Sequence, residues 1–111
     1  MSVTSNILLF QGAVLSAFGL IFVVAPSKIV PLKLDRKAWM IYRILGLWVV
    51  MGGFLSASIG WYAALEQQRV AAAGFAVLHA VETLVKVFSG AGSHSLQNVA
   101  FTGLLCVAAV L

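Results

Sequence analysis

Charged residues are scarce in this sequence. Asp, Glu, Lys and Arg make up 9% of its 111 residues, hydrophobic residues make up 62%, and the mean hydropathy is +1.07. Soluble domains carry about a quarter charged residues. The composition therefore excludes an ordinary soluble domain and predicts a membrane protein. The single cysteine, Cys106, excludes a disulfide within the chain.

Acidic residues and histidines, which most metal and acid–base sites need, number three and two. A carboxylate-bridged di-iron bundle needs several inward glutamates and histidines, but only Glu82 lies inside a long apolar run. A haem held by a pair of histidines needs both at one depth, and His94 lies in the turn GAGSHS, far from His79. The sequence therefore predicts no enzyme, no catalytic residues and no metal site or cofactor held by this chain alone.

Long apolar runs, in contrast, fill most of the chain. Four of them approach the roughly 20 residues that a transmembrane helix needs: about residues 7–25, 44–65, 70–88 and 95–111, the last being short. The first run has no basic residue before it and ends in VVAP, which predicts a retained span rather than a signal peptide. We therefore expect an all-α integral membrane protein, a compact four-transmembrane-helix bundle that forms a single domain over residues 1–111.

Basic residues lie mainly on one side of these predicted spans. Arg69 lies alone on one side, and the other six are Lys28, Lys33, Arg36, Lys37, Arg43 and Lys86. The positive-inside rule then predicts a multi-pass protein with both termini on the non-cytoplasmic, or equivalent, side. Because these charges flank apolar runs, lipid head groups explain them better than nucleic acid does. Membrane lipids are predicted partners, and nucleic acid is not.

Small residues recur at four-residue spacing in three of the runs. Such spacing lets transmembrane helices approach closely. The first run contains Gly12 and Ser16, and the predicted packing residues of the next two runs are Gly52, Ser56 and Gly60, followed by Ala72, Ala76 and Ala80.

The third run, GFAVLHAVETLVKVF, carries three ionisable residues on one helical face, namely His79, Glu82 and Lys86. A charged group at bilayer depth costs about 2.5 to 3.5 kcal/mol on insertion scales, so such groups face partners. The simplest interpretation is interhelical bonding, with Glu82 neutralised by Lys86 or Arg43 and His79 bonded to a serine (Ser16 or Ser56) or a backbone carbonyl. The alternatives are contact with a partner subunit or lipid-like ligand, and a His79 axial ligand to chlorophyll or haem.

A resemblance to a known family comes from the second run. Arg43, Gly46 and Trp48 form R-x-x-G-x-W at its start, small residues follow, and the next run carries a histidine and a glutamate. Over about sixty residues this resembles the Erg28-like family of small four-helix membrane scaffold proteins, which hold sterol C-4 demethylation enzymes together in the endoplasmic reticulum. The resemblance implies a scaffold without chemistry of its own.

Two hypotheses about function follow from these features. The first is a non-catalytic accessory or scaffold subunit that docks onto other integral membrane subunits of a larger complex. The second is a membrane ligand-binding module, with His79 as axial ligand to chlorophyll or haem, or with a lipid-like or sterol-like ligand on the polar stripe of the third run. Transport ranks third, because no predicted span contains an internal proline.

Overall fold

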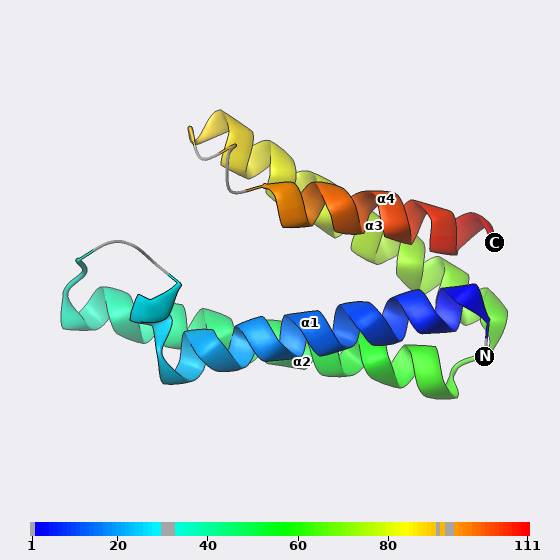
Figure 1. Cartoon of the computed structure of the whole chain (residues 1–111), viewed down its shortest axis with the longest axis horizontal. Helices are drawn as coiled ribbons and strands as arrows, with labels where there is room; N and C mark the ends of the chain where they lie inside the picture. Colours follow the sequence, from blue (N-terminus) through cyan, green and yellow to red (C-terminus); the bar gives the residue numbers. More distant parts are fainter. Residues whose placement is uncertain (1, 30–32, 91, 93–94) are drawn as a thin grey trace. The chain divides into compact units, whose positions relative to one another are not determined.

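The computed structural model of the chain describes residues 2–29, 33–90, 92 and 95–111, and this described part is all-helical. His94 lies outside it. The elements are α1 (Val3–Val24), a short 3-10 turn η1 (Pro26–Lys28), α2 (Arg36–Tyr62), α3 (Leu65–Phe88) and α4 (Leu96–Val110) (Figure 1). The all-α prediction is confirmed.

Three of the helices are long and apolar enough to cross a membrane: α1, α2 and α3, with 22, 27 and 24 residues. The fourth predicted span corresponds to α4, which has 15 residues. At about 1.5 Å per residue a helix of that length covers about 22 Å, less than the roughly 30 Å of a bilayer's hydrocarbon core. The described chain thus contains three candidate spans and one shorter apolar helix, rather than the four spans predicted.

Two of the helices, α2 and α3, begin earlier than their apolar runs, and a polar side chain bonds to a backbone N–H at the start of each. Asp35 Oδ1 accepts the backbone N–H of Ala38 at 2.8 Å, so α2 starts at Arg36 instead of residue 44. Gln67 Oε1 accepts the backbone N–H of Ala64 at 3.2 Å at the start of α3. Each bond satisfies a donor that a helix start otherwise leaves without a partner.

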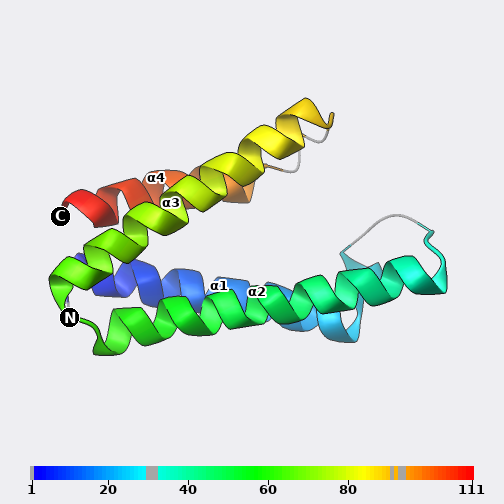
Figure 2. The ribbon, with the colours of Figure 1, turned by 180° about the vertical axis from the view of Figure 1, so that it is seen from behind.

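The chain divides into two compact units, and one of them is Phe10–Ala57, which contains most of α1 and α2. These helices lie side by side and antiparallel in both views (Figures 1 and 2). Glycines permit their close approach: a Cβ built on Gly12 would lie 2.7 Å from the carbonyl oxygen of Gly53, and one on Gly19 would lie 2.8 Å from that of Gly46. Side chains at these positions would force the backbones apart.

The predicted packing face of α2 needs one correction. A Cβ built on Gly52 would meet nothing within 4 Å, whereas one on Gly53 would lie 2.7 Å from the backbone nitrogen of Ser16. Gly52 therefore lies on the outer side of the α1–α2 pair, and Gly53 makes the close contact. Ser56 is fully buried and accepts a hydrogen bond from Gln11 Nε2 at 3.0 Å.

The second unit joins the first turns of α1, up to Leu9, to residues 58–111. Here α3 and α4 pack as an antiparallel hairpin (Figure 2). The buried apolar residues of this unit are Leu8, Ala72, Ala76, Phe101, Leu105 and Ala108. The predicted alanine face of α3 thus contributes two buried residues, while Ala80 is half-buried. The single-domain organisation stays a prediction.

Polar contacts hold the start of α1 to the hairpin. Gln68, which is 5% exposed, accepts a hydrogen bond from Ser5 Oγ at 2.9 Å and donates to the carbonyl oxygens of Gly60 and Ala63 at 3.2 and 3.0 Å. Thr4 Oγ1 donates to the carbonyl oxygen of Ala108 at 2.8 Å. The N-terminal turn of α1 and the C-terminal turn of α4 therefore lie together.

Candidate functional site

The ionisable residues predicted from the sequence lie in the α3–α4 hairpin. His79 is 2% exposed, and Glu82 and Lys86 follow it on the same face of α3, both half-buried. The helical spacing that predicted this shared face is i, i+3 and i+7. All three side chains point to one region because α4 packs along that face.

Asn98 of α4 connects the three residues. Its Nδ2 donates to Glu82 Oε2 at 2.6 Å and lies 3.2 Å from His79 Nδ1, while its Oδ1 accepts a hydrogen bond from Lys86 Nζ at 2.5 Å. The side chain is 4% exposed. We refer to His79, Glu82, Lys86 and Asn98 as the Asn98 cluster.

The chemistry of the neighbours determines how the Asn98 amide is oriented. An ammonium group has only donors and a carboxylate only acceptors, so the amide oxygen faces Lys86 and the amide nitrogen faces Glu82. The amide nitrogen can donate hydrogen bonds but cannot accept them, so His79 Nδ1 accepts from it. The neutral imidazole ring then carries its proton on Nε2. The opposite amide orientation would place like groups against each other.

The His79 ring also stacks on an aromatic side chain of α4. Its centroid lies 5.3 Å from that of Phe101, with an interplanar angle of 20°. Phe101 is 4% exposed, so the two rings form part of the buried interface. An axial ligand of haem or chlorophyll needs an accessible ring nitrogen and space for a macrocycle. Neither the burial of His79 nor its packing on Phe101 favours that role.

Two threonines beside the cluster bond to their own helices. Thr83 Oγ1 donates to the carbonyl oxygen of His79 at 2.9 Å, and Thr102 Oγ1 donates to that of Asn98 at 2.7 Å. These bonds satisfy the hydroxyl groups within each helix, as threonines commonly do in apolar surroundings.

The structure adds Asn98 as a partner of both His79 and Glu82. The structure places Asn98 against His79, and within the α1–α2 pair Ser56 accepts a hydrogen bond from Gln11 while Ser16 lies close to Gly53. Glu82 likewise bonds to Asn98, and Arg43 lines a pocket formed by other residues of Phe10–Ala57. The interhelical interpretation of the polar stripe is thus supported, with Asn98 of α4 as the partner in the described contacts.

Sequence reasoning missed Asn98. The available signal was an amide inside the apolar run of residues 95–111, where a buried polar side chain needs a partner. The position of Asn98 near the start of its run could have paired it with the polar stripe near the end of the third run. An antiparallel hairpin brings the end of one helix beside the start of the next.

Across the described residues, no three His, Cys, Asp or Glu side chains gather into a group that could hold a metal ion. The Asn98 cluster contains one histidine and one carboxylate, and both are bonded to an amide. A network of this kind can join two helices and balance a carboxylate against an ammonium group.

Compared with known protein families, curated proteins and solved structures, the chain matches none of them. The Erg28-like resemblance therefore stays a prediction, and the role of the chain must be argued from its own residues.

Proposed function

We propose that this chain is a multi-pass membrane protein that serves as a non-catalytic accessory or scaffold subunit of a larger membrane complex. The observation that carries the proposal is the bonding of the Asn98 cluster, in which one amide engages His79, Glu82 and Lys86 together. Groups held in this way stabilise a helical hairpin and are not poised to activate a substrate. The ionisable residues of α3 thus support a structural role.

The outer face of α2 supports docking onto other subunits. Trp48, Met51 and Leu55 share this face and are 65%, 60% and 54% exposed. Gly52 lies among them and has open space beside it. A small residue surrounded by large apolar ones lets a second helix approach closely. Lipid or the helices of other membrane subunits would cover such a surface.

The test is to purify the tagged chain from its native membrane in a mild detergent and measure the mass of the assembly by native electrophoresis and mass spectrometry. We expect an assembly much larger than the 11.8 kDa chain, with at least one other subunit in fixed stoichiometry. Gly52→Leu should release that subunit without unfolding the chain, because the position has free space.

Gly74→Leu is the matched control, since a Cβ at Gly74 also meets nothing within 4 Å but lies on α3. It should retain the partner. The proposal that other subunits dock on the outer face of α2 is wrong if the wild-type chain migrates alone in every mild detergent. It is also wrong if Gly52→Leu and Gly74→Leu retain the partner equally.

The absorbance spectrum of the same preparation tests the ligand-binding alternative. A scaffold held by the Asn98 cluster should be colourless, and His79→Leu should change only its stability. A stoichiometric visible chromophore that disappears with His79→Leu would replace the scaffold proposal with a pigment-binding or haem-binding module.

A further inference from the structure

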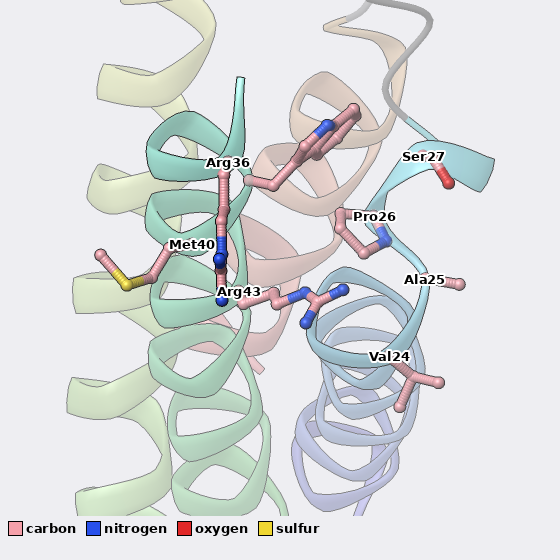
Figure 3. Close-up of a pocket in the computed structure, with 8 residues that line it drawn as sticks. Val24, Ala25, Pro26, Ser27, Arg36, Met40 and Arg43 are labelled. Atoms are coloured by element: carbon pink, nitrogen blue, oxygen red, sulfur yellow. The ribbon is translucent and has the colours of Figure 1, made fainter. Parts of the chain in front are cut away.

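A pocket of about 710 Å³ opens between the end of α1 and the first turns of α2 (Figure 3). Figure 3 shows Arg36, Met40 and Arg43 on the α2 side, with the Arg43 side chain extending toward the segment of Ala25 and Pro26. The pocket therefore has cationic groups on one wall and a chain turn on the other. Its lining residues are Val24, Ala25, Pro26, Ser27, Arg36, Trp39, Met40 and Arg43.

The packing of the two helices explains why the pocket forms at this end. At Gly19 and Gly46 the backbones nearly touch, because a Cβ on Gly46 would lie 2.8 Å from the Gly19 carbonyl oxygen. One turn further along, Phe22 and Tyr42 stack with centroids 6.2 Å apart and an interplanar angle of 9°. Beyond that stack the helices carry larger residues and no glycine contact, so the space between them widens into the pocket.

The charge of the chain is concentrated in the unit that holds this pocket. Phe10–Ala57 contains five basic residues and one acidic residue, Asp35, which gives a formal charge of +4; the rest of the chain has two of each and is neutral. Asp35 Oδ1 caps α2 by accepting from Ala38. Two of the five cations, Arg36 and Arg43, line the pocket.

The two arginines suit a phosphate group. They lie seven residues apart on α2, about 10.5 Å along the helix axis, a distance that two long side chains can close onto one headgroup. Guanidinium groups bind phosphate oxygens in a bidentate manner. The opposite wall, with Val24 and Pro26, is apolar and suits the hydrocarbon that adjoins a lipid headgroup.

We propose that this pocket binds the phosphate of an anionic phospholipid, with Arg36 and Arg43 on the headgroup and the apolar wall against the first acyl carbons. The inference rests on the membrane placement proposed above. Trp39 lines the same pocket and lies 6.1 Å from Tyr42 between ring centroids. Such aromatic pairs are typical of the head-group level of a bilayer, and basic pockets between membrane helices bind anionic head groups.

Trp39 also provides a probe inside the pocket. The other tryptophans, Trp48 and Trp61, are 65% and 60% exposed, so replacing both with phenylalanine leaves the buried packing intact and makes Trp39 the single reporter. The full chain is reconstituted in bilayers that contain either brominated phosphatidylglycerol or brominated phosphatidylcholine, and quenching of Trp39 measures the relative affinity of each lipid.

We expect the anionic lipid to be preferred by about 5-fold to 30-fold, the range for one or two arginine contacts at a membrane surface. Arg36→Gln with Arg43→Gln should reduce the preference to near unity. The control is Lys28→Gln with Lys37→Gln, which removes the same charge from residues that do not line the pocket and should retain most of the preference. Unchanged circular dichroism establishes that each variant is folded.

Several outcomes would overturn the proposal, and each has a separate meaning. Equal loss in the arginine and lysine pairs would mean a diffuse surface potential rather than a site. Loss of the preference on adding inorganic phosphate, with chloride at equal ionic strength as the comparison, would mean a site for free phosphate. Equal quenching by both lipids would leave the chain in the bilayer without a headgroup site. No quenching by either lipid would contradict the proposal that the chain lies in a membrane.

Discussion

The contact between Gly12 and Gly53 can be tested by adding one methyl group at either of two adjacent positions. A Cβ at Gly53 would lie 2.6 Å from Ser16 Oγ, 2.7 Å from the Ser16 backbone nitrogen and 2.8 Å from the Gly12 carbonyl oxygen. A Cβ at Gly52 meets nothing within 4 Å. Gly53→Ala and Gly52→Ala therefore change the same chemistry in the same helix and differ only in what the methyl group contacts.

The size of the effect follows from these distances. Unstrained heavy atoms lie about 3.5 Å apart or more, so the backbones must separate by about 0.8 Å to admit the methyl group at Gly53. A gap of that order removes about a quarter to a half of the local dispersion energy. Overpacking of this kind costs about 1 to 3 kcal/mol. Replacing glycine with alanine within a helix contributes about 1 kcal/mol in the opposite sense, and this term is common to both variants.

We therefore expect Gly53→Ala to be less stable than Gly52→Ala by about 1 to 3 kcal/mol. The assay is reversible unfolding in mixed micelles with increasing sodium dodecyl sulfate, followed by circular dichroism, with the wild-type chain measured in parallel. Gly52→Ala should be as stable as the wild type or slightly more stable. Equal midpoints for the two variants, or a less stable Gly52→Ala, would show that the α1–α2 pair does not pack through Gly53.

Three further predictions concern the Asn98 cluster and the topology. Asn98→Leu should destabilise the chain by about 1 to 3 kcal/mol. The neighbouring Gln97→Leu makes a similar change in size and polarity and should not destabilise it. Equal effects in the same unfolding assay would rule out Asn98 as the residue that joins the Asn98 cluster. Glu82→Gln should lower the free energy of unfolding only slightly, because an acceptor oxygen remains for the Asn98 amide. Lys86→Leu should lower it by about 1 to 2 kcal/mol more, since it leaves the Glu82 carboxylate uncompensated. The reverse order of stabilities would contradict the pairing of Glu82 with Lys86. In a cysteine-free background, Ser2→Cys should react with an impermeant thiol reagent from the side opposite the basic loop, and labelling from the basic-loop side would invert the topology.

The helical class and the three long apolar helices could be predicted because they depend on local composition. An apolar run of about 20 residues favours a helix whatever it packs against, since unpaired backbone groups are too costly in hydrocarbon. The shared face of His79, Glu82 and Lys86 is equally local, because the helical repeat alone places i, i+3 and i+7 together. The starts of α2 and α3 were less predictable, since the side chains of Asp35 and Gln67 bond to backbone N–H groups there and both helices begin before their apolar residues.

Which side of each helix meets its neighbour depended on the tertiary structure. Gly52 and Gly53 are adjacent, and successive residues point about 100° apart around a helix, so a list of small residues cannot state which one faces α1. The partner of the polar stripe is a similar case. Asn98 meets His79 and Glu82 only because the α3–α4 hairpin has one register. A register shifted by one turn would move the amide about 5.4 Å along α3, so that it could no longer bond to His79 and Glu82 together.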